Sequence, residues 1–331
     1  MQEHKPEKFS HPHSTVCPLC PQHCTVAEGE RGHCQARGCH QGHMISLTYG
    51  KVAAMHVDPI EKKPLFHFYP GTSILSAGGN GCNLSCTFCQ NFEISQYQVP
   101  GQEYTPAELS RMALQENSLG ICFTYSEPLV WFEMVLATAT LVKEAGGKTV
   151  LVTNGIIMPR YLRQLLEVID AVNIDVKAFR DDFYRTYTGG RLSWVLKSLE
   201  EMAASGVHIE ISTLIIPGLN DRSEEIQELA HYLKDLQTPL AWHLNRYFPA
   251  YKADYPPTPE HSLRTLAAIS REYLPYVYLG NMGYGAATLC PSCQSVLIDR
   301  TGSVGRADIV QKTVNGKCPG CGLEIWGQGL A

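Results

Sequence analysis

Thirteen cysteines dominate the chemistry that this sequence can offer, and all but Cys122 fall into three tight groups. The groups are Cys17, Cys20, Cys24, Cys34 and Cys39; Cys82, Cys86 and Cys89; and Cys290, Cys293, Cys318 and Cys321. An odd total at CxxC-like spacings, in a chain whose first residues lack the apolar core of a secretion signal, argues against a disulfide framework and for metal or redox sites. We interpret Cys122, in an apolar stretch, as a small buried hydrophobic residue.

The central group has the spacing CxxxCxxC and follows a glycine-rich loop, Ala77-Gly-Gly-Asn-Gly81. Thiolates bind iron–sulfur clusters, and a cubane has four irons. Three cysteines on one loop therefore leave one iron open to a substrate or cofactor. A structural zinc ion needs a fourth local ligand, and no Cys or His lies nearby. The spacing favours a cluster, with zinc or a coincidental grouping as the alternatives.

The carboxyl-terminal group consists of two CPxC knuckles that 24 residues separate. Two such knuckles can converge on one tetrahedral site that zinc or a single iron satisfies. A module of about 40 residues buries little core by itself, so a metal would stabilise it. We expect a zinc ribbon or a rubredoxin-like module here, with free thiols as the alternative.

The amino-terminal cysteines follow the pattern C-x2-C-x3-C-x9-C, from Cys17 to Cys34. Four thiolates can hold zinc or an auxiliary cluster, and Cys39, His23 and His33 are further candidate ligands. Unliganded thiols are the alternative. The pattern does not indicate whether this group is structural or contacts a substrate.

Between these tails, short β-like runs alternate with helical segments. The β-like runs begin at Ser73, Gly120, Lys148, Ala171, His208 and Leu240, and helices are expected from Thr105 and over 129–145, 159–168, 193–205, 221–236 and 259–272. This alternation predicts a parallel α/β sheet of βαβ units. About six units favour a partial (β/α)6 barrel, and a doubly wound sheet is the alternative. We expect three parts: a Cys- and His-rich extension over 1–50, the barrel over 51–285 and a metal ribbon over 286–331.

Polar residues follow several predicted strands, where the functional groups of (β/α) barrels gather. They are Glu127 in Thr-Tyr-Ser-Glu-Pro, Thr153 and Asn154 before a glycine, Asp175 and Lys177, and His243. Each has a structural alternative. The acidic residues can interact with a helix dipole, Thr-Asn-Gly is an ordinary turn, and His243 can be a hydrogen-bonded core histidine.

With Phe88 before its last cysteine, the CxxxCxxC motif resembles the signature of the radical S-adenosylmethionine (SAM) superfamily. The resemblance implies a [4Fe–4S] cluster whose free iron chelates the methionine part of SAM. One electron then cleaves SAM to a 5′-deoxyadenosyl radical, which abstracts hydrogen from a substrate. It also implies a low-potential electron donor such as flavodoxin or ferredoxin.

The strand-end loops look like those of pyruvate formate-lyase activating enzymes, which read GGEP, TNG and DLK with a late histidine. The similarity implies that Glu127 accepts the SAM amino group, that Lys177 meets the SAM carboxylate, and that His243 hydrogen-bonds SAM or shuttles a proton. Phe88, Thr153, Asn154 and Asp175 are carried over as cofactor-binding positions. Tyr125-Ser126 replaces the two glycines, which puts the backbone contacts of that loop in doubt.

A narrower resemblance covers nearly the whole chain. The segments that carry it include Cys17-Pro-Leu-Cys20, Pro59-Ile-Glu-Lys-Lys-Pro-Leu65, Trp242-His-Leu-Asn-Arg-Tyr-Phe-Pro249 and Tyr278-Leu-Gly-Asn281. Together they look like the AmmeMemoRadiSam-system radical SAM enzymes. This resemblance does not identify a substrate. From the likeness to activating enzymes we expect radical modification of a partner protein, with a small molecule or peptide as the alternative substrate. A non-catalytic metal-binding interaction protein is the alternative from a different class.

The composition is that of an ordinary globular protein. Hydrophobic residues make up 44% of the 331 residues, charged residues 18%, and the net charge is −5. This balance gives no global attraction to nucleic acid or an anionic membrane. No apolar run approaches the roughly 20 residues that span a bilayer. We expect a cytoplasmic protein.

Overall fold

The computed structural model describes residues 14–115, 117–283, 286–300 and 309–330. Its centre is an eight-stranded sheet in the order β14-β13-β12-β11-β10-β9-β7-β6, in which only the β6–β7 pair is antiparallel. The strands are β6 (Ala54–Pro59), β7 (Ser73–Gly78), β9 (Gly120–Phe123), β10 (Lys148–Thr153), β11 (Ala171–Asp175), β12 (His208–Ile215), β13 (Ala241–Arg246) and β14 (Val277–Gly280).

The strand order decides between the two predicted architectures. The parallel strands follow one another in chain order, with no switch point at which the order reverses. Right-handed crossovers that all run in one direction place their helices on one face, as in a barrel, whereas a doubly wound sheet needs a reversal. The predicted parallel α/β sheet is confirmed in barrel-like form, with seven parallel strands rather than six.

Helices connect the parallel strands and begin close to where the sequence predicts them. They are α2 (Pro106–Ala113), α3 (Phe132–Glu144), α4 (Pro159–Leu166), α6 (Leu192–Ser205), α7 (Ser223–Asp235) and α8 (Glu260–Arg271), with short helices α1 (Phe92–Ser95) and α5 (Asp181–Phe183) in the loops. The capping box is present: the Glu108 N–H donates to the Thr105 hydroxyl, and the Thr105 N–H donates to the Glu108 carboxylate. These reciprocal bonds satisfy donors that the first turn leaves free.

The interior of the sheet is filled by side chains from the strands and from the segment before β7. Ile60, Leu65 and Phe68 pack there against Ile74 and Cys122, all fully buried. Cys122 therefore occupies the apolar position that its surroundings predict. This apolar plug closes one end of the barrel, so open space remains at the carboxyl ends of the strands.

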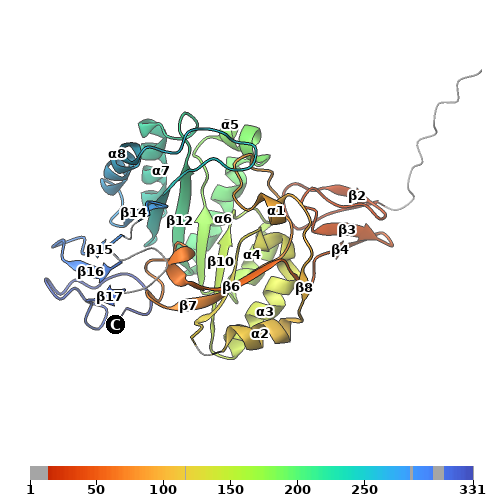
Figure 1. Cartoon of the computed structure of the whole chain (residues 1–331), viewed down its shortest axis with the longest axis horizontal. Coiled ribbons are helices and arrows are strands. Elements are labelled where there is room, and N and C mark those ends of the chain that lie inside the picture. The colour runs from red at the N-terminus through yellow and green to blue at the C-terminus, as the bar shows by residue number, and fades with distance from the viewer. Residues whose placement is uncertain (1–13, 116, 284–285, 301–308, 331) are drawn as a thin grey trace, which may run out of the picture.

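Small β-structures lie at two ends of the molecule (Figure 1). The amino-terminal part contains the pairs β1 (Ser14–Val16) with β2 (Thr25–Ala27) and β3 (Arg37–His40) with β4 (His43–Ser46), and β5 (Lys51–Val52) pairs with β8 (Gln102–Glu103). The carboxyl-terminal part is a three-stranded sheet of β15 (Thr288–Leu289), β16 (Val296–Asp299) and β17 (Val310–Gln311). Residues 1–13 of the predicted extension and 301–308 of the predicted ribbon lie outside the described residues.

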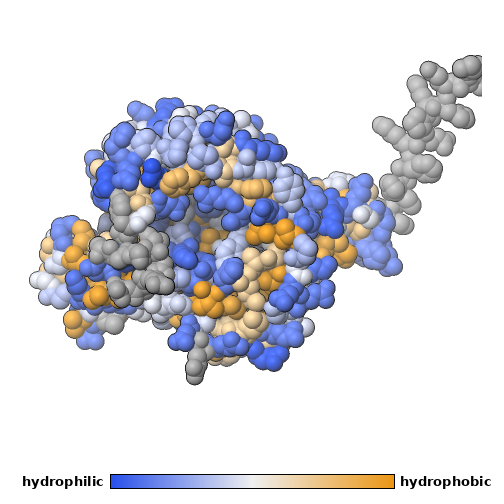
Figure 2. Space-filling view, in the orientation of Figure 1, coloured by the Kyte–Doolittle hydropathy of each residue, from blue (hydrophilic) through white to orange (hydrophobic). Residues whose placement is uncertain are grey.

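The surface over α7 and α8 is mostly hydrophilic, as solvent-exposed helix faces require (Figure 2). Within the described ranges, none of the helices combines the length and the apolarity that crossing a membrane demands.

Candidate functional site

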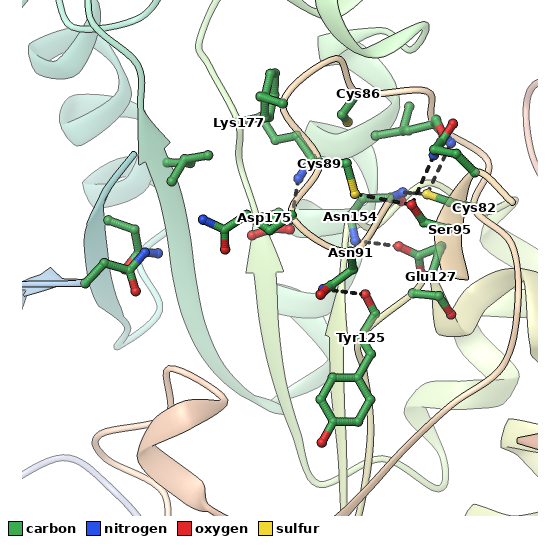
Figure 3. Close-up of a pocket in the computed structure, with 18 residues that line it drawn as sticks. Cys82, Cys86, Cys89, Asn91, Ser95, Tyr125, Glu127, Asn154, Asp175 and Lys177 are labelled. Carbon is green, nitrogen blue, oxygen red and sulfur yellow. Dashed lines mark hydrogen bonds and ion pairs between the residues drawn. The ribbon is translucent and has the colours of Figure 1, made fainter. Parts of the chain in front are cut away.

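The central cysteines lie on the loop between β7 and α1, at the open end of the barrel. Cys82, Cys86 and Cys89 line a pocket of about 240 Å³ (Figure 3). Gly81 lets the chain turn tightly into this loop, with a φ of +103° that favours glycine. Side chains at or just after the ends of β9, β10, β11, β12, β13 and β14 line the same pocket. The structure thus brings the cysteine triad together with residues from six strand ends.

The donor set of the triad fits an iron–sulfur cluster with one open iron. Three thiols converge on the pocket, and its lining contains no fourth Cys and no His. Polar groups face the sulfurs: the Leu84 N–H lies 3.4 Å and the Asn154 Nδ2 3.7 Å from the Cys82 Sγ. Such donors stabilise thiolate, the form that binds metal. Burial raises the pKa of the Cys86 thiol to about 12, so metal binding must displace its proton.

Glu127 presents a buried carboxylate to this pocket. It accepts hydrogen bonds from the Thr153 hydroxyl at 2.6 Å, the Asn154 N–H at 2.8 Å and the Leu129 N–H at 3.0 Å. Burial raises the pKa of Glu127 to about 7, although these hydrogen bonds act in the opposite direction. A fixed carboxylate in a poorly solvated site gains from a cationic partner, because the partner offsets the cost of its charge.

Lys177 and Asp175 form an ion pair at the end of β11, with Nζ and Oδ2 3.0 Å apart. Both residues line the pocket. Burial alone would lower the pKa of Lys177, but the charge of Asp175 holds it above the usual range. The ammonium therefore remains charged beside the Cys86 sulfur and can attract an anionic ligand.

Asn154 and Thr153 act differently from each other. The Asn154 side chain lies in the pocket, where its Nδ2 donates to the Asn83 Oδ1 at 2.8 Å and its Oδ1 accepts from the Ile156 N–H. Its amide thus ties β10 to the cysteine loop. Thr153 is buried and does not line the pocket; its hydroxyl donates to Glu127. The structure therefore places Thr153 behind the carboxylate.

Phe88 is buried and lines the pocket, with its ring centroid 5.9 Å from that of Phe183. This contact packs the cysteine loop against the short helix α5. The aromatic residue of the motif thus forms part of the wall between two cysteines.

His243 does not line this pocket. Its Nε2 lies 2.7 Å from the Glu210 carboxylate, and its ring packs edge-on against Phe66. Burial would raise the pKa of Glu210, but hydrogen bonds from His208 and His243 hold it below the usual range. This is the core-histidine alternative. Side chains on one face of a strand recur every second residue, and the pocket residue of β13 is Asn245.

Several pocket residues were not singled out from the sequence. They lie near the ends of strands or on the segment from Cys89 to the end of α1, and they include Gln90, Asn91, Gln96, Leu214, Asn245 and Asn281. Asn245 and Asn281 lie at the ends of β13 and β14, a signal that reading alternate positions to each strand end could have found. Tyr125 also lines the pocket, and its hydroxyl donates to the Asp58 carboxylate at 2.6 Å.

The carboxyl-terminal cysteines converge as the two knuckles predict. The sulfurs of Cys290 and Cys321 are 3.6 Å apart, those of Cys293 and Cys318 are 3.5 Å apart, and all four lie within 4.8 Å of one another. A tetrahedral ion with Zn–S bonds of about 2.3 Å separates its sulfurs by roughly 3.8 Å. This group is a four-cysteine metal site whose spacing suits zinc or one iron.

The amino-terminal cysteines also gather around one space. Cys17, Cys20, Cys24 and Cys34 line a second pocket, beside the cysteine loop. Cys39 lies apart from it, with its sulfur 3.6 Å from the Glu28 carboxylate. Of the spare candidates, His33 lines this pocket and His23 does not.

Comparisons with known proteins agree with this geometry. A model of the radical SAM superfamily matches residues 77–233. The protein MJ0808 of Methanocaldococcus jannaschii is 39% identical over 320 residues, 93% of this chain and 94% of that protein. The pyruvate formate-lyase-activating enzyme of Clostridium pasteurianum is 31% identical over 166 residues, 47% of this chain and 68% of the enzyme. A radical SAM methyltransferase from Sphaerobacter thermophilus shares the fold, with a TM-score of 0.51 at 16% identity over 64% of this chain and 67% of that one.

Proposed function

This chain belongs to the radical SAM superfamily, and we propose that it cleaves SAM reductively and uses the resulting radical to abstract hydrogen from a substrate. The observation that carries the proposal is the shared pocket: three thiols of one loop face Glu127 and Lys177 across it (Figure 3). A bound [4Fe–4S] cluster, reduced by a low-potential donor such as flavodoxin or ferredoxin, supplies the electron for the cleavage. Cys82, Cys86 and Cys89 would hold it.

Two charged residues would orient SAM. Glu127 would accept hydrogen bonds from the SAM amino group, since its carboxylate is fixed by three donors, all of them uncharged. Lys177 would attract the SAM carboxylate from the end of β11, where Asp175 keeps it charged. The opposite charges of these groups match the two ends of the amino-acid part of SAM.

Other residues would position this pair. Asn154 would keep the distance between the cysteine loop and Glu127, because it bonds to both. Thr153 would act through Glu127, and Phe88 would shield the cysteine loop. We assign to Asn245 the pocket-facing role at β13 that the sequence predicts for His243, which is bonded to Glu210 instead.

We propose that the substrate is part of a polypeptide, as in an activating-type enzyme that modifies a partner protein. The amides of Gln90, Asn91, Asn245 and Asn281 line the pocket and can both donate and accept hydrogen bonds, as recognition of a peptide backbone requires. The relation to a pyruvate formate-lyase-activating enzyme over 47% of this chain supports the same class. A small molecule is the second candidate.

The short segments quoted above, which are spread over nearly the whole chain, are the basis on which we propose membership of the AmmeMemoRadiSam group. The cytoplasmic location is a separate proposal, based on the first residues and the apolar runs of the sequence. The non-catalytic alternative is disfavoured by the pocket, which is open and holds charged groups of both signs next to the thiols. An interaction module would have no use for a buried carboxylate such as Glu127 in that place.

The test is anaerobic reconstitution with iron and sulfide, followed by an assay for 5′-deoxyadenosine with dithionite and SAM. Cys86→Ala should abolish the product, while Cys122→Ala, which alters a buried cysteine outside the pocket, should retain it. Cleavage that persists in Cys86→Ala would refute the proposal. Deuterium transfer into 5′-deoxyadenosine from labelled polypeptides or small molecules would then identify the substrate class.

A further inference from the structure

The four amino-terminal cysteines form a site of their own. Cys17, Cys20 and Cys24 lie in and next to the turn between β1 and β2, which the Cys17 N–H closes by donating to the Cys24 carbonyl at 2.9 Å. Cys34 comes from the following loop, before β3. All four line one pocket, all four are free thiols, and all but Cys24 are buried. Buried, unpaired thiols around one space are a metal-binding arrangement.

The spacing of the sulfurs distinguishes this site from the carboxyl-terminal one. In the carboxyl-terminal group, the four sulfurs all lie within 4.8 Å of one another. Among the described residues, no other group of three or more candidate metal ligands is as close together. The sulfurs of the amino-terminal cysteines are not this close to one another, and neither are those of Cys82, Cys86 and Cys89. Each sulfur around a cubane binds a different iron, which separates the sulfurs more than one ion does. The amino-terminal group therefore shares the wider spacing of the cluster triad.

An unpartnered donor points to a ligand in the same pocket. Arg37 lines the pocket and is 6% exposed. Its Nη1 donates to the Glu133 carboxylate at 2.6 Å, whereas its Nε is buried and has no hydrogen-bond partner in the described part of the chain. A buried donor without an acceptor is costly. The sulfides and thiolates of an iron–sulfur cluster are acceptors that can satisfy it.

The pocket is fixed against the cysteine loop of the catalytic site. Asn83, the residue after Cys82, lines the amino-terminal pocket, and its carbonyl accepts from the Gln22 side chain at 3.1 Å. The Met158 N–H donates to the Leu19 carbonyl at 2.9 Å, which ties the turn to the end of the barrel. A preorganised cradle of this kind suits a rigid cofactor.

We propose that Cys17, Cys20, Cys24 and Cys34 bind a second [4Fe–4S] cluster, adjacent to the one at Cys82, Cys86 and Cys89. Four cysteine ligands leave no iron of this cluster open. The site is therefore suited to hold or transfer electrons and not to bind SAM. The inference goes beyond the proposed function and does not depend on it.

The experiment uses the full-length protein, reconstituted anaerobically with iron and sulfide, with iron, sulfide and zinc counted per chain and the iron examined by Mössbauer spectroscopy. Wild type should hold about eight cluster irons, since each cubane has four. The variant Cys82→Ala/Cys86→Ala/Cys89→Ala should keep about four with an all-cysteine [4Fe–4S] spectrum. Cys39→Ser, outside the pocket, should match wild type.

Zinc in place of cluster iron in the triple variant would overturn the inference, as would wild type that holds about four cluster irons, one of them without a cysteine ligand. Wild type is itself a test, so the inference stays falsifiable if the triple variant fails to fold. The proposed function fails differently, through absence of 5′-deoxyadenosine from protein that holds its full iron.

Discussion

Asn154 donates its backbone N–H to the Glu127 carboxylate at 2.8 Å, and its side-chain amide donates to Asn83 at the same distance. One residue thus holds both the carboxylate proposed to bind SAM and the loop that carries Cys82. The relative position of carboxylate and cysteines is thereby set by one turn after β10, in which Gly155 adopts the left-handed conformation at φ +73°. A site that must align a cofactor with a metal benefits from such coupling.

Replacing Glu127 with Gln should weaken SAM binding by about 10- to 100-fold, because a hydrogen bond to a charged group contributes roughly 1.5–3 kcal/mol. The side chain keeps its shape but loses the charge that faces the SAM amino group. Isothermal titration of reconstituted protein measures the Kd. Glu228→Gln, on the exposed face of α7, is the matched control and should bind as wild type does. Equal affinity in Glu127→Gln would contradict the assigned role.

The raised pKa of Glu127 also predicts how the stability of the metal-free protein depends on pH. The carboxyl ionises near 4.5 in the unfolded chain and near 7 in the folded one, because burial disfavours its charge. Between these values the folded protein binds more protons, so this group makes the unfolding free energy fall as pH rises from about 4.5 to 7. Below and above that window its contribution is constant.

Urea unfolding of metal-free wild type and Glu127→Gln at pH 5 and pH 8 isolates this effect. The stability of wild type relative to the variant should be greater at pH 5 than at pH 8, since Gln does not titrate. A difference that is the same at both pH values would show that Glu127 does not ionise in this range.

Lys177→Met should raise the Kd for SAM by about tenfold, because the variant removes the charge while it keeps most of the length of the side chain. It also leaves Asp175 without its partner at 3.0 Å, next to the pocket. Lys197→Met, on the exposed face of α6, is the control and should change nothing. The double variant Asp175→Asn/Lys177→Met separates the two causes: if the loss came only from the unpaired aspartate, the second change would restore binding.

Much of this site was predictable because its signals are local. The boundaries between strands and helices follow from apolar runs, prolines and a capping box. For example, a helix is predicted over 159–168, and α4 is observed at Pro159–Leu166. β6 was missed because its side chains are half-buried or exposed, and only its pairing with β7 makes it a strand. Local sequence carries no information about such a partner.

The depth at which a side chain lies along the barrel was the second limit. His243 and Asn245 lie on the same face of β13, and the choice between them depends on how far the plug of residues 60–68 fills the barrel. That depth is a tertiary property. The bond between Tyr125 and Asp58, 67 residues apart, was unpredictable for the same reason.

Gly81→Ala should impair folding and cluster incorporation together. A Cβ at this position would overlap with the Cys34 carbonyl oxygen, in a backbone conformation of φ +103°. The Cβ is fixed by its own backbone and the carbonyl belongs to the backbone of Cys34, so neither atom can move away without a shift of the main chain. We therefore expect the unfolding free energy to fall by about 2 kcal/mol or more. Gly146→Ala shares a positive φ, +83°, but its added Cβ would have no atom of the described residues within 4 Å, apart from its own chain neighbours.

Urea unfolding and iron content of both glycine variants separate two effects of the substitution: the unfavourable positive φ, and the steric overlap of the added Cβ with the Cys34 carbonyl. Gly146→Ala should show a smaller loss of stability, of about 1 kcal/mol, with normal iron content. If the two variants behaved alike, the contact between the cysteine loop and the amino-terminal turn would not matter for the site.

Loss of the carboxyl-terminal metal should release Trp326 from the barrel. Its ring stacks on His208 with centroids 4.6 Å apart, and its carbonyl lies 2.9 Å from the His67 Nδ1. Ile325, the preceding residue, packs with Cys290 and Cys318. A small module without its metal loses much of its folding free energy, so these contacts should loosen.

Cys318→Ser is the variant that removes one metal ligand with little change in volume. We expect a lower metal content, a red shift of tryptophan fluorescence and a Tm lower by about 5 °C, or roughly 2 kcal/mol. Adding Trp326→Phe should remove the red shift and keep the decrease in Tm. A red shift of equal size in the double variant would mean that another tryptophan reports the change, and that the ribbon does not hold Trp326 against His208.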